Sequence, residues 1–184
     1  ASVEAQFKKY KYPEDGYSKV RMYWRYGGSF IGTMTETNRY AKSYRSPYLE
    51  FVVNQSIYME GEAPFADLIL PACTNFERWD IGEWASCAGY VPHSNLGCNR
   101  RVIVLQKPCI EPLGESKSDY DIFAMVAKRL DFYEKYTEGG KTLYDWVKRM
   151  FEISDLPKFI TWEEFEKKGY FVVPLPEDYK PTPA

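Results

Sequence analysis

Short apolar segments separated by a helical pattern dominate the first half of the chain. Val20–Trp24 is rich in β-branched and aromatic residues, as strands are, and Leu49–Val53 is apolar enough to be buried on both faces. A helix is predicted between them at Thr35–Tyr44, and a third strand at Leu68–Leu70. The order strand, helix, strand predicts a right-handed βαβ unit, and the fold class is therefore α/β: a Rossmann-like, three-layer domain with a mostly parallel sheet.

The second half of the chain combines an aperiodic stretch with three predicted helices. From Pro71 to Asn99, aromatic residues, glycines and prolines alternate without a period, and a stretch of this length is rarely idle in a compact domain. One more strand is predicted at Arg101–Leu105. The start of each helix is marked by a hydroxyl residue and an acidic residue three positions later, the pattern of a capping box. The pairs are Ser118 with Asp121, Thr142 with Asp145, and Thr161 with Glu164.

The spacing of apolar residues predicts an inner face for two of these helices. On the first it contains Phe123, Val126 or Ala127, and Leu130. On the second it contains Leu143, Trp146 or Val147, and Met150. Gly169 is well placed to end the third helix. We expect an entering arm at 1–18, the Rossmann-like domain at 19–170 with an aromatic loop at 73–100, and an extended, proline-rich tail or linker at 171–184.

The composition and the net charge exclude several classes of protein. Hydrophobic residues make up 45% of the 184, which excludes a disordered chain. A net charge of −2 gives no bulk attraction to nucleic acid or to an anionic membrane, and no apolar run approaches the length of a bilayer span. The chain opens without Met or a signal-like segment, so we expect it to be part of a longer protein.

The cysteines and the aromatic residues bear on the chemistry. Four cysteines without a C-x-x-C pair, and a single histidine, predict no self-contained metal site, and the thiols are interpreted as buried and reduced. They are Cys73, Cys87, Cys98 and Cys109. Aromatic residues reach 17%, which suits core packing, a large interface or a cavity lined by rings.

Ligands of an open parallel sheet bind beyond the carboxyl ends of its strands. This rule selects four segments: Gly27–Ser29, Asn54–Ser56, the loop after Pro71, and the helix start at Ser118 and Asp119. Glycines allow close approach to a phosphate, Arg78 supplies positive charge, and Asp119 offers acceptors to a base or a sugar. Together the segments favour nucleotide binding, although each one alone also fits an ordinary turn or helix cap.

Three segments together resemble the large subunits of molybdopterin oxidoreductases, the dimethyl sulfoxide reductase family. They are Phe51–Met59, Ala66–Ala72 followed by Glu77, and Gly114–Phe123 followed by Ala127–Leu130, in matching order and spacing. The resemblance implies a Rossmann-like domain that grips one molybdopterin guanine dinucleotide. At matching positions it implies cofactor contacts from Gly28, Ser29, Gln55, Ser56, Arg78 and Asp119. Ser29 stands where the family often has Asn, and Arg78 where it often has Lys.

Within the family, the aromatic segment Trp79–His93 is most similar to enzymes that move a hydroxyl between polyhydroxylated benzenes, such as pyrogallol and phloroglucinol. A planar phenol suits a loop that offers rings for stacking and a tyrosine hydroxyl for hydrogen bonding. By this resemblance Tyr90 is the predicted catalytic residue, hydrogen-bonded to the substrate, and Cys87 lines the pocket. The alternative for Cys87 is a small buried apolar side chain. His93, Trp79 and Trp84 are given no chemical role.

The resemblance also implies an assembly. The cofactor is molybdenum bis(molybdopterin guanine dinucleotide), bound jointly with the rest of the large subunit, which would supply the metal ligand and the remaining acid and base groups. An iron–sulfur small subunit, a trihydroxybenzene substrate and a cytoplasmic location are expected, with no nucleic acid and no membrane partner. Two alternatives stay open: the same cofactor acting on an oxyanion or sulfur compound, and a non-catalytic interaction module.

Overall fold

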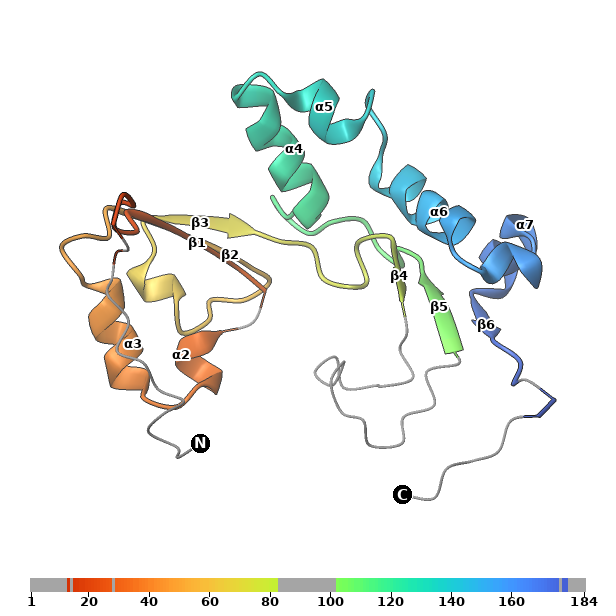
Figure 1. Cartoon of the computed structure of the whole chain (residues 1–184), viewed down its shortest axis with the longest axis horizontal. Helices are drawn as coiled ribbons and strands as arrows, with labels where there is room; N and C mark the ends of the chain where they lie inside the picture. The colour runs from red at the N-terminus through yellow and green to blue at the C-terminus, as the bar shows by residue number, and fades with distance from the viewer. Residues whose placement is uncertain (1–12, 14, 28, 83–101, 176, 179–184) are drawn as a thin grey trace. The chain divides into compact units, whose positions relative to one another are not determined.

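The computed structural model describes residues 13, 15–27, 29–82, 102–175 and 177–178. The chain forms two compact units, Ala1–Pro71 and Ala72–Ala184 (Figure 1). We refer to them as unit 1 and unit 2. The domain bounds expected from the sequence, 19–170 and 171–184, remain predictions.

Unit 1 contains the predicted parallel sheet, which confirms the α/β class. Its strands are β1 (Met22–Tyr26), β2 (Phe51–Ser56) and β3 (Leu68–Pro71), in the order β1-β2-β3. Both pairings are parallel, and Arg25 lies opposite Asn54. The 3-10 helix η1 (Ala63–Phe65) precedes β3. All three strand predictions are therefore confirmed, with bounds shifted by at most three residues.

Two helices, rather than one, connect β1 to β2 (Figure 1). They are α2 (Phe30–Thr33) and α3 (Thr37–Tyr44). The predicted start at Thr35 is wrong because Glu36 adopts a left-handed backbone, with φ of 62°, which an α-helix cannot continue through. The aromatic side chains of Phe30 and Tyr40 stack across the two helices with ring centroids 6.0 Å apart.

Unit 2 contains a second, antiparallel sheet that the sequence did not predict. Its strands are β4 (Asp80–Gly82), β5 (Val102–Gln106) and β6 (Tyr170–Val172), in the order β4-β5-β6. Only β5 was expected. Because β6 pairs with β5, the predicted extended tail begins as a sheet strand. The described part of the chain thus has one parallel and one antiparallel sheet.

The helices of unit 2 begin where the caps predicted. They are α4 (Asp119–Arg129), α5 (Tyr133–Thr137), α6 (Leu143–Ile153), η3 (Leu156–Lys158) and α7 (Trp162–Lys168). Thr142 and Thr161 form complete capping boxes, and the Ser118 hydroxyl accepts a hydrogen bond from the amide of Asp121. Gly169 ends α7 with φ of 80°. Helix α5 was not predicted.

The core of unit 2 forms where α6 and α7 meet strand β5. Its buried members are Leu105, Val147, Phe151, Leu156, Trp162 and Phe165. Phe151 stacks on Phe165 with centroids 5.3 Å apart, so Phe151 is the residue that faces the core at this turn of α6. Met150 was predicted there and is 52% exposed, and Leu130 at the end of α4 is 63% exposed. No helix in the described part of the chain is long and apolar enough to span a membrane.

Candidate functional site

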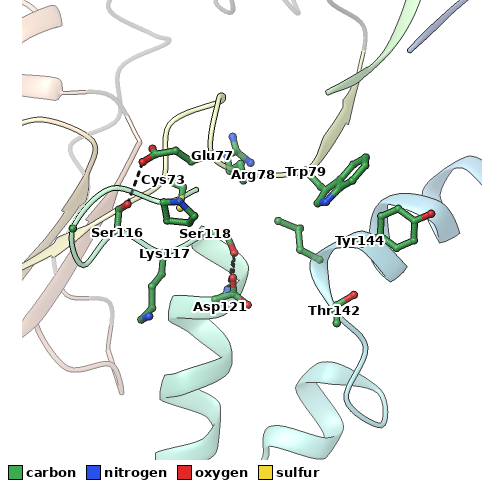
Figure 2. A pocket seen from close by; sticks show the side chains of 13 residues that line it. Cys73, Glu77, Arg78, Trp79, Ser116, Lys117, Ser118, Asp121, Thr142 and Tyr144 are labelled. Atoms are coloured by element: carbon green, nitrogen blue, oxygen red, sulfur yellow. Dashed lines mark hydrogen bonds between the residues drawn. The ribbon is translucent and has the colours of Figure 1, made fainter. Parts of the chain in front are cut away.

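A cavity of about 570 Å³ lies within unit 2. Three segments line it: the residues that follow β3, the residues before and at the start of α4, and the start of α6 (Figure 2). The side chains that carry its chemistry are Cys73, Glu77, Arg78, Ser118, Asp121 and Tyr144. The segment after β3 and the helix start of α4 are two of the four segments that the sequence selected.

Glu77 is a buried carboxylate, 7% exposed, that accepts hydrogen bonds at both oxygens. Its Oε2 accepts from the amide of Thr74 at 2.6 Å and from the hydroxyl of the same residue at 2.7 Å. Its Oε1 accepts from the amide of Leu113 at 2.6 Å and from the hydroxyl of Ser116 at 3.4 Å. These donors, led by the Thr74 hydroxyl, lower the pKa of Glu77 to about 2, so the group is ionised at neutral pH.

Arg78 contributes positive charge to the cavity. One terminal nitrogen lies 3.1 Å from a carboxylate oxygen of Asp80, and the other donates to the Asn75 side chain at 3.3 Å. Its Nε atom is buried and has no hydrogen-bond partner among the described residues. A buried N–H group of this kind is normally satisfied, so it offers a donor to an anionic or polar ligand.

The start of α4 forms another wall of the cavity. The Ser118 hydroxyl donates to Asp121 Oδ2 at 2.6 Å and accepts from the amide of the same residue at 3.1 Å. Asp121 lines the cavity, whereas Asp119 is half-buried at the first position of α4 and is not among the lining residues. Asp121, two positions after the predicted residue Asp119, therefore lines the cavity in its place and was not predicted as a contact.

Aromatic side chains form the far side of the cavity (Figure 2). Trp79 packs edge-on against Tyr144, with centroids 5.0 Å apart. The Tyr144 hydroxyl accepts from the indole of Trp162 at 3.1 Å and donates to Glu166 at 2.9 Å, which fixes its ring. The surface suits contact with a planar ring.

Cys73 is the thiol of the cavity. It is buried, as expected for a reduced cysteine, and burial raises its pKa, so it stays protonated at neutral pH. Cys109, the other cysteine that the structure describes, is exposed, against the expectation. No group of three or more metal-ligating side chains occurs among the residues with described positions.

In unit 1, the predicted residues at the end of β2 are buried and hydrogen-bonded. Gln55 is 1% exposed, and its Oε1 accepts from the indole of Trp24 at 3.0 Å. The Ser56 hydroxyl donates to Glu60 at 2.6 Å. Asn54 is completely buried, and neither atom of its amide group has a hydrogen-bond partner among the described residues. Such unsatisfied groups are rare in folded proteins and mark a place for a ligand or water.

A second buried carboxylate holds the loop after β1. Glu62 is completely buried, and its Oε1 accepts from the amides of Phe30 at 2.5 Å and Ile31 at 2.9 Å. Burial alone would raise its pKa, but the Ser29 hydroxyl and these amides outweigh burial and lower the pKa of Glu62. Ser29 also caps α2, accepting from the amide of Gly32 at 2.8 Å. Sequence reasoning missed Glu62, since nothing local distinguishes it from a solvated acid.

The predicted site residues thus fall in two groups. Unit 1 holds Ser29, Gln55 and Ser56, while Arg78 and Asp119 belong to unit 2. Gly28, Cys87 and Tyr90 lie outside the described residues. Gln55 and Ser56 end strand β2, Ser29 caps α2, Arg78 follows β3, and Asp119 begins α4.

Comparison with known proteins decides the family. Residues 4–129 match the family described as Molybdopterin oxidoreductase. The chain belongs to this family. The resemblance found in the sequence is confirmed, and so is a molybdopterin-type cofactor at the level of the family.

The chain is 57% identical, over 99% of its length, to the pyrogallol hydroxytransferase large subunit of Pelobacter acidigallici. It is 30% identical, over 83% of its length, to the dimethyl sulfoxide reductase DmsA of Escherichia coli K12. Among solved structures, acetylene hydratase from Pelobacter acetylenicus has a TM-score of 0.59 and 20% identity over 91% of the chain, which supports the fold. The chain spans 21% of the first relative, 18% of the second and 20% of the hydratase chain.

Proposed function

We propose that this chain is part of the catalytic large subunit of a molybdenum-dependent transhydroxylase. The observation that carries this proposal is the 57% identity over nearly the whole chain to a pyrogallol hydroxytransferase large subunit. The reaction moves a hydroxyl between two polyhydroxylated benzenes, of which pyrogallol and phloroglucinol are the expected pair. One ring exchanges a hydroxyl for hydrogen while the other exchanges hydrogen for a hydroxyl, so no outside oxidant or reductant is consumed.

We propose molybdenum bis(molybdopterin guanine dinucleotide) as the cofactor, with one guanine dinucleotide held by this chain. The buried, unpartnered Nε of Arg78 and the unpartnered amide of Asn54 support the fit, because each offers an unused hydrogen-bonding group near a predicted contact. The resemblance implies that the cofactor is held by Gly28, Ser29, Gln55, Ser56, Arg78 and Asp119. When bound, the molybdenum supplies two-electron redox chemistry and oxygen transfer.

The residues of this chain would bind and orient the cofactor and the substrate. Arg78 neutralises negative charge, and the edge-on pair of Trp79 and Tyr144 excludes water from one side of the cavity. Tyr90 hydrogen-bonds the phenol and Cys87 lines its pocket, as the resemblance implies. The other partners in this proposal are the rest of the large subunit and an iron–sulfur small subunit, in the cytoplasm.

The proposal is tested on the purified holoenzyme. Molybdenum and acid-released GMP are measured per large subunit, and turnover of pyrogallol is followed by chromatography. Absence of molybdenum and pterin from an active sample contradicts the proposal and favours an unrelated role, including a non-catalytic interaction module.

The role of Tyr90 has a separate test. Tyr90→Phe is expected to lower turnover about tenfold through one lost hydrogen bond, with molybdenum content unchanged. Tyr17→Phe is the matched control, since Tyr17 is 73% exposed. Unchanged kinetics in Tyr90→Phe would show that the hydroxyl does not act on the substrate.

A second candidate is a reductase that uses the same cofactor on a sulfur compound or an oxyanion. The 30% identity to a dimethyl sulfoxide reductase favours it. Reduction of dimethyl sulfoxide by the holoenzyme with a reduced viologen dye, without turnover of pyrogallol, would select this alternative.

A further inference from the structure

Glu77 joins the two stretches of chain that carry the predicted cofactor contacts of unit 2. Its hydrogen bonds reach Thr74 on its own loop, and Leu113 and Ser116 on the segment that leads into α4. The two segments are also joined at their other end, where the amide of Cys73 donates to the carbonyl of Lys117 at 2.9 Å. The carboxylate therefore fixes the loop that presents the next residue, Arg78, to the segment that begins α4.

The site requires an ionised carboxylate. All four partners are donors, and two of them are backbone N–H groups, which cannot reverse their polarity. A glutamine in this place has one acceptor oxygen and one NH₂ group, so the NH₂ group would face the amide of either Thr74 or Leu113. Two donors then face each other, and one of the two segments loses its attachment.

Glu77 is poorly placed to contact a ligand itself. Oε2 accepts from two donors, Oε1 accepts from the amide of Leu113 and lies 3.4 Å from the Ser116 hydroxyl, and the residue is 7% exposed. In Figure 2 its carboxylate points toward Ser116, whereas the Arg78 side chain leaves the loop separately. Its effect on a bound molecule must therefore pass through the residues that it positions.

We infer that Glu77 is a positioning residue, which places Arg78 and the start of α4 to retain the nucleotide end of the cofactor. This inference rests on the proposed function. It assigns to Glu77 the retention of the cofactor and no part in the transfer of the hydroxyl.

The test compares Glu77→Gln with Glu164→Gln in the holoenzyme. Glu164 also accepts hydrogen bonds from an amide and a hydroxyl of a single threonine, Thr161, but in the capping box of α7, away from the cavity. Molybdenum and acid-released GMP are measured after extended dialysis, and kcat per molybdenum atom and KM for pyrogallol are measured on the molecules that stay loaded.

Glu77→Gln is expected to retain roughly tenfold less molybdenum and GMP than the wild type, the effect of one or two lost charged hydrogen bonds. Glu164→Gln is expected to retain both, and kcat per molybdenum atom and KM are expected to be unchanged in each variant. Normal retention in Glu77→Gln overturns the inference. So does a fall in kcat per molybdenum atom at normal retention, because Glu77 would then act in the reaction.

Two milder variants apply where Glu77→Gln does not fold. Thr74→Val removes the 2.7 Å hydroxyl bond, and Ser116→Ala removes the 3.4 Å contact together with the 2.8 Å bond from the Ser116 hydroxyl to the Leu113 carbonyl; each leaves the carboxylate in place. Loss of cofactor is expected to be greater in Thr74→Val, and retention equal to the wild type in both overturns the inference. A wild-type holoenzyme without molybdenum overturns the proposed function, and this inference with it.

Discussion

Each unit uses a buried carboxylate to hold a loop that carries a predicted cofactor contact. The units differ in how fully their buried polar groups are hydrogen-bonded. Glu62 in unit 1 and Glu77 in unit 2 are buried carboxylates that accept backbone amides from another segment. Glu77 has donors at both oxygens, whereas Oε2 of Glu62 is buried without a hydrogen-bond partner among the described residues. Unit 1 also holds the unsatisfied amide of Asn54.

The hydrophobic cores of the two units also differ, in the size of their buried side chains. Among the described residues, the buried apolar residues of unit 1 are Val52, Val53 and Ala63, while unit 2 has a cluster of large side chains around Phe165. Among the described residues, unit 2 therefore has the larger apolar core, and unit 1 has more unsatisfied buried polar groups on its sheet and loops.

The largest effect is expected in the core of unit 2. Phe165→Ala removes a side chain with 0% exposure and should lower the free energy of unfolding by about 3–5 kcal/mol. Urea denaturation followed by tryptophan fluorescence measures it. Phe76→Ala is the control in the same unit, because Phe76 is 66% exposed and its loss should change stability by less than about 0.5 kcal/mol. Equal effects of the two variants would contradict the assignment of the core.

A smaller loss is expected for the carboxylate of unit 1. Glu62→Met removes the oxygen that accepts from the amides of Phe30 and Ile31, and should cost about 1–3 kcal/mol. Thermal unfolding monitored by circular dichroism measures this cost. Glu36→Met is the matched control, since Glu36 forms an exposed ion pair with Arg39, worth little. A loss no larger than that of the control would mean that Glu62 does not hold the loop.

Replacement of two neighbouring side chains on β2 should change the free energy of unfolding in opposite directions. Gln55→Leu removes the acceptor of the Trp24 indole and should destabilise by about 1 kcal/mol. Asn54→Leu removes a buried amide without a partner and should stabilise the cofactor-free protein by about 1 kcal/mol. The denaturant concentrations at the unfolding midpoints of both variants measure these changes in stability. A destabilising Asn54→Leu would show that Asn54 has a partner in solution and that unit 1 is more complete than its hydrogen bonds indicate.

The smallest effect is local and depends on pH. Because the pKa of Glu77 is lowered from 4.5 to about 2, its contribution to stability is present above pH 4.5 and is lost as the pH falls toward 2. Hydrogen exchange at the amide of Leu113 should lose protection over this interval. In Glu77→Gln the protection should be weak and independent of pH there. A wild-type protection that stays constant from pH 4.5 to pH 2 would contradict the proposed anchoring.

Local signals predicted much of the fold. The three parallel strands follow from short runs of β-branched and aromatic residues, and the capping boxes at Thr142 and Thr161 lie within four consecutive residues each. Strands β4 and β6 have three residues each and pair across large separations, as between Gly82 and Val104. A strand that short has no periodicity of its own, and its partner decides that it forms.

The candidate site was predicted less completely than the fold. The strand-end rule selected Gln55, Ser56 and Arg78, because it depends only on where strands stop. Glu77 was noted only as part of a motif and Glu62 not at all, since an acidic residue that collects amides looks in sequence like one that faces water. Their role depends on donors from Leu113 and Phe30, more than thirty residues away in each case.

The pairing of β4 with β5 has a consequence for how specificity can diverge. Gly82 lies opposite Val104, so the chain leaves β4 and returns to β5 at neighbouring points of one ladder. The intervening connection, 83–101, is where the sequence places Tyr90 and Cys87. A stem fixed in this way lets the connection be lengthened, shortened or replaced while both ends stay anchored. On the proposed function, in which Tyr90 and Cys87 contact the substrate, exchange of this connection would change substrate preference without rebuilding the ladder that anchors it.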